Sequence, residues 1–211
     1  ELKNITINTP NNITLIKNLS FKVNVGQHLF IEGPNGSGKT SIFRIICGLW
    51  EPYKNIGQII IPDKQTDIYF LSQRPYIVPT LNIKQQLIYP SQNQNRFDDE
   101  TIVNILKFVQ IYDTLLLRSK DNNIFDADIL KGLSGGECQR IGMARILLHK
   151  PLFALLDECT SAVSKDMKNI FFQECIRLNI TLITIAHDME LKKYHKKTLK
   201  IDKNSWKIED L

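Results

Sequence analysis

The chain has 211 residues, of which 43% are hydrophobic and 23% are charged. This composition is close to the average for a soluble globular protein, so it argues against a disordered chain and against a collagen-like or fibrous one. The formal net charge of +5 at pH 7 fits an anionic ligand. Because this mild basic excess is spread over the whole length, it is weak support for nucleic-acid binding, and we expect no nucleic-acid partner.

The four cysteines are widely separated, and none forms a CxxC pair. We therefore expect neither a zinc site nor a disulfide framework, and we interpret the cysteines as small buried residues of a protein from a reducing compartment. No apolar run approaches the roughly 18 residues of a membrane span, and no signal peptide is visible. Because the chain opens at Glu1 directly in strand-like sequence, we expect a domain excised from a longer protein.

The first third of the chain has the pattern of short strands around a glycine-rich turn. Residues 19–25 alternate between apolar and polar side chains, which predicts a half-buried strand. A second strand, 28–32, runs into the glycine-rich turn, and a helix is expected over 39–49. Further strands are predicted over 59–61 and 68–71.

From about residue 81 to 150 the pattern becomes helical, and Asp98 and Asp99 are candidate N-caps for a helix with a periodic apolar face. The apolar runs 152–156 and 181–186 have the length of buried parallel strands, with a helix between them. Strands that alternate with helices indicate an α/β core with a helical insert. The Lys-rich tail, 192–203, is interpreted as a solvated face, with contact to a membrane or a nucleic acid as the alternative.

Residues 33–40 fit the pattern G-x-x-x-x-G-K-[ST] between a predicted strand and a predicted helix, which is the context of a phosphate-binding P-loop. The glycines let backbone N–H groups turn toward phosphate oxygens, and the helix adds its positive N-terminal end. Lys39 is expected to reach the β- and γ-phosphates, and Thr40 to hold Mg²⁺. The alternative is a glycine-rich turn without a ligand. The predicted nucleotide-binding residues are Gly33, Pro34, Asn35, Gly36, Ser37, Gly38, Lys39, Thr40 and Ser41.

An apolar strand that ends in two carboxylates, Asp157 and Glu158, lies later in the chain. Ligands bind at strand ends in open α/β sheets, so Asp157 is expected to hold Mg²⁺, directly or through water. Glu158 is a candidate general base for an attacking water. The alternative interpretation, in which the pair only caps the next helix, is disfavoured by the P-loop.

A third motif, LSGGE, follows the helical segment and comprises Leu133, Ser134, Gly135, Gly136 and Glu137. Ser134 and Glu137 have the spacing of a capping box at a helix start. The two glycines leave bare backbone there, so the helix start predicts either a second phosphate-binding surface or a plain cap.

Together, the P-loop, LSGGE and the run LLDE at 155–158 resemble the nucleotide-binding domain of ABC transporters, in order and spacing across nearly the whole chain. The resemblance implies the α/β fold of an ABC-type P-loop ATPase: a mixed sheet with flanking helices, an antiparallel β edge and an inserted helical subdomain that carries LSGGE. It implies one domain, 1–211, with 1–80 and 150–211 in the catalytic core and 81–149 in the helical subdomain.

The same resemblance implies roles for residues outside these motifs. Gln73 is similar to the Q-loop glutamine, which contacts Mg²⁺ and water, and His187 to the switch histidine, which contacts the γ-phosphate. The D-loop, which crosses the dimer interface in the family, would comprise Ser161, Ala162, Val163 and Ser164. The expected catalytic residues are thus Glu158, His187, Gln73 and Lys39, and the expected Mg²⁺ ligands are Thr40, Gln73 and Asp157.

Several segments resemble the D subfamily in particular, among them 73–76, 88–90 and 156–164. One departure from the family pattern lies at 9–11, where many members carry an aromatic residue that stacks on adenine. We expect adenine to pack here on Pro10 or on aliphatic side chains.

D-subfamily members are half-transporters, mostly peroxisomal importers of fatty acids or acyl-CoA esters. The resemblance therefore implies an ATP- and Mg²⁺-dependent motor domain that hydrolyses ATP. Its partners would be a second nucleotide-binding domain, identical or not, and a transmembrane domain that is absent from this chain. The domain would face the cytosol at a peroxisomal membrane, with a lysosomal or bacterial inner membrane as alternatives.

Three other functions stay open at this point. The first is an ABC ATPase with another substrate, such as cobalamin or a peptide, and the second is a non-transport ABC ATPase of translation or DNA repair. The repair types carry a long heptad insertion, and none is present. The third is a nucleotide-binding pseudo-enzyme, against which the intact Lys39, Asp157, Glu158 and His187 argue.

Overall fold

A computed structural model describes residues 1–91, 93–119, 121–202 and 205–211. The chain divides into two compact units, and each is described separately. The first unit comprises Glu1–Phe70, Pro151–Glu158 and Asn179–Leu211. The second unit comprises Leu71–Lys150 and Cys159–Leu178, and it contains the whole of the expected helical subdomain.

The strands are β1 (Leu2–Asn8), β2 (Thr14–Phe21), β3 (Leu29–Glu32), β4 (Gln58–Ile59), β5 (Ile68–Leu71), β6 (Phe153–Asp157), β7 (Thr181–Ile185), β8 (Lys197–Asp202) and β9 (Ser205–Asp210). The α-helices are α1 (Lys39–Ile46), α2 (Ile83–Ile88), α3 (Asp99–Phe108), α4 (Tyr112–Arg118), α5 (Gly135–His149) and α6 (Lys165–Arg177). Short 3₁₀ helices are η1 (Tyr53–Asn55), η2 (Gln65–Asp67), η3 (Gln94–Arg96), η4 (Ala127–Leu130) and η5 (Met189–Tyr194).

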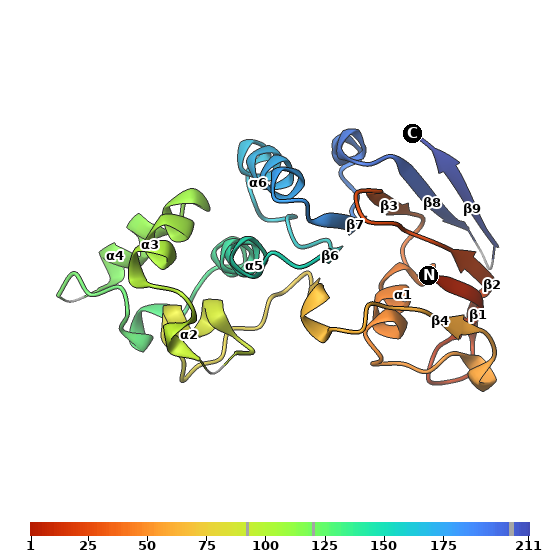
Figure 1. The fold of residues 1–211 in the computed structure, drawn as a ribbon, viewed down its shortest axis with the longest axis horizontal. Helices are drawn as coiled ribbons and strands as arrows, with labels where there is room; N and C mark the ends of the chain where they lie inside the picture. The colour runs from red at the N-terminus through yellow and green to blue at the C-terminus, as the bar shows by residue number, and fades with distance from the viewer. Residues whose placement is uncertain (92, 120, 203–204) are drawn as a thin grey trace. The chain divides into compact units, whose positions relative to one another are not determined.

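Two sheets organise the strands. The larger sheet has the order β5-β6-β7-β3-β8-β9. In it β6, β7, β3 and β8 are parallel neighbours, while β9 returns antiparallel to β8 (Figure 1). The smaller sheet, β2-β1-β4, is antiparallel. The predicted α/β fold with a mixed sheet and an antiparallel β edge is thereby confirmed.

The first unit is built on one apolar core that both sheets and α1 share. Ile5 and Ile16 from the antiparallel sheet, Phe43 from α1, and Ile31 and Leu199 from the larger sheet are fully buried in it. Each such side chain contributes about 1.5–3 kcal/mol when it leaves water. The loops that follow β3, β6 and β7 therefore project from a firmly packed base.

The second unit is helical, and its helices begin at polar caps. Asp98 accepts a hydrogen bond from Thr101 N at 2.7 Å at the start of α3, which confirms it as the cap, whereas Asp99, the other candidate, is the first residue of the helix. Asn82 and Ser134 each form a capping box, at the starts of α2 and α5. Among the residues the structure describes, no helix combines the length and the apolar character that a membrane crossing requires.

The expectation that the cysteines are buried is correct for two of the four. Cys159 and Cys175 are buried, whereas Cys47 and Cys138 are half-buried. Burial nevertheless raises the pKa of the Cys47 thiol to about 11, so this side chain stays protonated at neutral pH.

Three predicted elements end two or more residues away from the observed boundary. The strand predicted over 19–25 ends at Phe21, because the next residues enter a turn that Gln27 N closes onto Asn24 O. The helix predicted over 39–49 ends at Ile46, since Gly48 takes a left-handed conformation that stops it. The strand predicted over 59–61 is the shorter β4.

The Lys-rich tail is also not simply a solvated face, because half of it forms strand β8 in the larger sheet. Its apolar residues Leu199 and Ile201 are buried, and the intervening lysines point to acidic partners. Lys200, for example, pairs with Glu209 and lies 4.0 Å from Glu32. The basic side chains thus form surface ion pairs beside a buried strand.

Candidate nucleotide-binding site

The carboxyl ends of three parallel strands bring the first group of candidate residues to one edge of the larger sheet. Ile31 pairs with Ile185, and Asp157 pairs with Ile185 on its other side. The P-loop (33–40) follows β3, Glu158 follows β6 and His187 follows β7. Residues that are far apart in sequence are therefore neighbours here, as the pattern of strand ends predicts.

The P-loop begins at a position where only glycine fits. Gly33 has φ 154°, and a Cβ built on it would lie 2.4 Å from Ile201 O of β8. Gly36 and Gly38 also have positive φ values, of 77° and 97°. Side chains at these positions would strain the turn that directs the following backbone into α1.

Lys39 opens α1 and bends back into the loop. Its Nζ donates hydrogen bonds to Gly33 O at 2.8 Å and Pro34 O at 2.9 Å, and the residue is only 7% exposed. Desolvation by burial lowers the pKa of this ammonium group, while the nearby carboxylates of Glu158 and Asp157 oppose that shift. The ammonium group is thereby hydrogen-bonded to two neutral carbonyl groups of the loop, with the two carboxylates acting on it through their charge.

The hydroxyl groups of Ser37 and Thr40 in the P-loop indicate where a ligand could bind. Ser37 Oγ is buried and has no hydrogen-bond partner within the described part of the chain. Such buried orphans are uncommon in folded proteins. Thr40 Oγ1 donates to Asp157 Oδ1 at 3.1 Å, which joins the first turn of α1 to the end of β6. Ser41, the last predicted residue of this group, is buried.

Asp157 is 6% exposed. Burial raises the pKa of its carboxyl group and Glu158 raises it further, while the Thr40 hydrogen bond and the charges of Arg44 and Lys39 lower it. A buried anion with one hydroxyl partner is well placed to be neutralised by a bound cation.

Glu158 and His187 form a pair at the same edge of the sheet. His187 Nε2 lies 3.0 Å from Glu158 Oε1, and both side chains reach solvent. Glu158 has the unusual φ of 49°, and its backbone N–H donates to Ile185 O at 2.9 Å, one residue beyond the regular strand pairing. The backbone thus fixes the direction of the carboxylate, and the histidine holds one of its oxygens.

A hollow of about 360 Å³ opens beside these groups. Its walls are Glu32, Gly33, Pro34, Ala186, His187, Met189, Lys200 and Ile201. In the turn between β1 and β2, Pro10 is exposed and the neighbouring Ile13 is 63% exposed. Packing of adenine on such aliphatic side chains stays a prediction.

The second unit carries the LSGGE segment (133–137) at the start of α5. Ser134 N donates to Glu137 Oε2 at 2.6 Å, and Glu137 N donates to Ser134 Oγ at 3.3 Å, which is the predicted capping box. Ser134 and Gly135 are exposed, so their backbone faces solvent. The N-terminal end of a 15-residue helix, with its partial positive charge, lies directly behind them.

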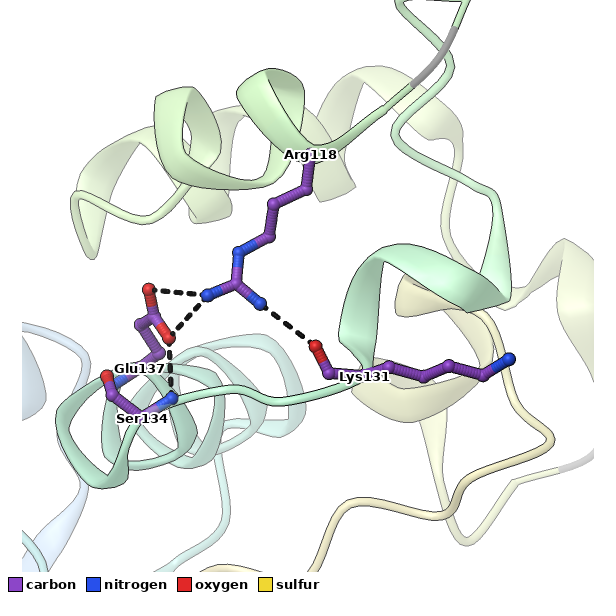
Figure 2. A network of polar contacts seen from close by, with 4 residues as sticks. All are labelled: Arg118, Lys131, Ser134 and Glu137. Atoms are coloured by element: carbon purple, nitrogen blue, oxygen red, sulfur yellow. Dashed lines mark hydrogen bonds and ion pairs between the residues drawn. The ribbon is translucent and has the colours of Figure 1, made fainter.

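Arg118, at the end of α4, braces this segment (Figure 2). Its guanidinium group donates to both oxygens of Glu137, at 3.3 and 3.1 Å, and to Lys131 O at 3.1 Å. Nη2 makes both bonds to Glu137 and Nη1 makes the bond to Lys131, so Glu137 both caps the helix and binds Arg118. Sequence reasoning missed Arg118, because nothing in the sequence indicates which arginine of the helical part lies near the cap.

The second unit also contains Gln73 and the D-loop (161–164). Gln73, Ser161, Ala162 and Ser164 are exposed, and Val163 is buried. Ser164 caps α6 by accepting a hydrogen bond from Met167 N at 3.4 Å. Each unit therefore gathers its own set of predicted residues.

Comparison with known proteins identifies the family. The family model described as "ABC transporter" matches residues 16–161. ABC transporter D family member 2 of Dictyostelium discoideum is 38% identical over 199 residues, which are 92% of this chain and 26% of that protein. ATP-binding cassette sub-family D member 3 of Mus musculus is 38% identical over 203 residues, which are 94% of this chain and 30% of that protein.

A solved structure supports the same fold. The structure of a bacterial Atm1-family ABC exporter with ATP bound has a TM-score of 0.79 at 23% identity. The match covers 96% of this chain and 36% of the exporter chain. The chain thus spans about a third or less of the proteins it matches, and the predicted ABC-type ATPase fold and resemblance to D-family members are confirmed. The chain belongs to the ABC transporter family.

Proposed function

We propose that this chain is the ATP-binding and ATP-hydrolysing motor domain of a membrane half-transporter. The observation that carries the proposal is the arrangement at the carboxyl edge of the larger sheet. There a buried lysine lies inside a glycine-rich loop, and a carboxylate–histidine pair follows the neighbouring strands. A phosphate site combined with a candidate base is what hydrolysis of a nucleoside triphosphate needs.

The P-loop would hold the phosphates of ATP. Its buried Ser37 Oγ, which has no partner in the described residues, is a hydroxyl donor suited to a phosphate oxygen. Lys39 would exchange its two carbonyl contacts for the β- and γ-phosphate oxygens, which are stronger, charged acceptors. The N–H groups at the start of α1 would complete the cradle.

The hydroxyl of Thr40 and the carboxylate of Asp157 fit the oxygen donors that Mg²⁺ prefers, and they already lie 3.1 Å apart. No cluster of three or more His, Cys, Asp or Glu side chains that could hold a metal occurs in the described ranges. A divalent ion in the first unit would thus rely on Thr40, Asp157 and the phosphates. The bound ion would neutralise charge on the phosphates during hydrolysis.

Glu158 would accept a proton from the attacking water at its carboxylate. His187 holds Glu158 Oε1 at 3.0 Å and would orient the carboxylate or contact the γ-phosphate. A positioned general base of this kind contributes about 10²–10⁴ in rate.

A second copy would complete the site. The exposed Ser134 and Gly135 and the half-buried Gly136 form a helix start, which suits the γ-phosphate held by a partner's P-loop. The D-loop would lie at the interface between the copies, and hydrolysis would require the pair. Loss of the γ-phosphate would remove the bridge and open the dimer.

The transport role and its location rest on the relatives. The two D-family proteins named above are three to four times as long as the segment they share with this chain. We propose that the parent protein carries a transmembrane domain and moves fatty acids or acyl-CoA esters across a peroxisomal membrane. The nucleotide-binding domain would face the cytosol.

The test is ATPase activity as a function of protein concentration. The rate per molecule should rise with concentration, and Glu158→Gln should lower turnover at least about 100-fold with ATP affinity retained. The matched control is Glu51→Gln at an exposed position of the same unit, which should behave as wild type. Near-normal turnover by Glu158→Gln would exclude Glu158 as the base, and a rate per molecule independent of dilution would exclude the dimer.

A further inference from the structure

One face of α5 carries a buried glutamine between two glycines. Gly136, Gln139 and Gly142 are spaced three residues apart, so they lie along the same side of the helix. Gln139 is 3% exposed, although glutamine is mostly found at protein surfaces. A buried amide needs partners for its two N–H donors and its carbonyl oxygen, so its contacts are informative.

The partners of Gln139 lie in two loops that carry proposed site residues. Gln139 Nε2 donates to Gln73 O at 3.0 Å and to Ser161 Oγ at 3.1 Å. Gln139 Oε1 accepts a hydrogen bond from Ala162 N at 2.9 Å. One side chain thereby uses both donors and its acceptor to join the loop at Gln73 with the D-loop.

The two glycines let both loops approach the helix closely. A Cβ on Gly136 would lie 2.7 Å from Ala162 O of the D-loop. A Cβ on Gly142 would lie 2.5 Å from Leu71 Cδ1 and 3.0 Å from Pro75 Cγ, on either side of Gln73 in sequence. Both loops therefore rest against bare backbone of α5, and the glutamine lies between the two contact points.

We propose that Gln139 is a positioning residue that couples the Gln73 loop (72–78) to the D-loop. The same side-chain amide is hydrogen-bonded to both loops. When one loop shifts, it pulls on this amide and so disturbs the bonds to the second loop, and the two loops therefore move together. The consequence of this coupling rests on the proposed function, since in an ATP-dependent dimer it would link the Gln73 loop to the D-loop residues at the interface. The contacts themselves hold whether or not the chain hydrolyses ATP.

The first test is amide hydrogen exchange on the 211-residue chain, which needs no activity. Gln139→Leu removes all three hydrogen bonds, so peptides covering 72–78 and 159–164 should exchange about tenfold faster. Helix α3, elsewhere in the same unit, should be unchanged. The matched control, Gln173→Leu on the exposed side of α6, should leave both loops as in wild type. Unchanged loops, or an equal loosening of α3, would overturn the proposal.

Gln139→Glu distinguishes the contact to the Gln73 loop from the contact to the D-loop. It also replaces the leucine variant if that variant folds poorly. A carboxylate still accepts from Ala162 N and from the Ser161 hydroxyl, but it repels Gln73 O. Exchange should therefore rise about tenfold in 72–78 and stay within about twofold of wild type at Ala162. Equal changes in both loops, or a change in neither, would overturn the assigned contacts.

The last arm measures steady-state ATP hydrolysis by the same variants. We expect Gln139→Glu to lower kcat about tenfold while KM for ATP stays within about twofold, since no phosphate contact is lost. A raised KM with unchanged kcat would overturn the positioning role. Absence of hydrolysis by the wild-type chain would instead refute the proposed function, and the exchange experiment would still decide the coupling.

Discussion

The buried His195 makes the stability of the first unit depend on pH. The residue is 6% exposed, its Nδ1 lies 2.8 Å from Leu191 O, and its Nε2 lies 2.8 Å from Thr184 Oγ1. Burial lowers its pKa from 6.5 to about 4, against the effect of the Leu191 carbonyl and with a smaller contribution from His28. The native imidazole is therefore neutral at pH 7 and well below it.

The sign of the effect follows from proton binding. The unfolded chain takes up a proton at this histidine near pH 6.5, whereas the native protein does so only near pH 4. Between these values the unfolded state binds more protons, so stability rises with pH. The contribution is fully present above about pH 6.5 and is lost as the pH falls toward 4. At about 1.4 kcal/mol per pH unit, it amounts to about 3 kcal/mol.

Urea unfolding of the wild-type chain and of His195→Gln measures this contribution. Glutamine does not titrate, so the variant should be less stable at about pH 7 but have a flatter pH dependence. The stability difference between the two proteins should shrink by about 2–3 kcal/mol between about pH 7 and about pH 4.5. Parallel pH curves would refute the assignment of a buried neutral histidine.

Three further substitutions test the site. Gly33→Ala places a Cβ against Ile201 O and should lower the free energy of unfolding by about 2 kcal/mol or more. Thermal unfolding measures this loss, and an unchanged melting temperature would contradict the close approach. Lys39→Ala should weaken ATP binding at least about 30-fold in calorimetry, and unchanged affinity would remove the lysine from the phosphate site. Arg118→Ala should lower turnover about threefold at fixed protein concentration. Arg118→Lys should be intermediate, because one ammonium nitrogen cannot replace both Nη2, which donates to Glu137, and Nη1, which donates to Lys131 O. Equal rates in all three proteins would show that this contact does not affect turnover.

The parts of the fold that sequence predicted well are those in which local chemistry decides the structure. The P-loop glycines, the Asp98 cap and the Ser134 capping box are each fixed by a few neighbouring residues. The strand over 68–71 has the predicted bounds, since its apolar run is bounded by polar residues. In these cases propensity and tertiary packing agree.

Long-range packing accounts for what sequence reasoning missed. The lysines of the tail suggested a solvated face, although Leu199 and Ile201 alternate with polar residues in the manner of a strand. The acidic partners of Lys200, Glu32 and Glu209, lie outside the tail in sequence, so the sequence gives no sign of these ion pairs. Gln139 gives no local sign of burial, since its partners come from two loops that are remote in sequence. Contacts of this kind exist only once the chain has folded.

The left-handed backbone of Glu158, with φ 49°, has a consequence for protein engineering. For a side chain with a Cβ this conformation costs about 1 kcal/mol relative to glycine. Replacement by glycine at this position should therefore relieve this strain while it removes the carboxylate that we propose as the base. Selection for thermal stability alone would favour such inactive variants. Directed evolution of this domain therefore has to select for turnover as well.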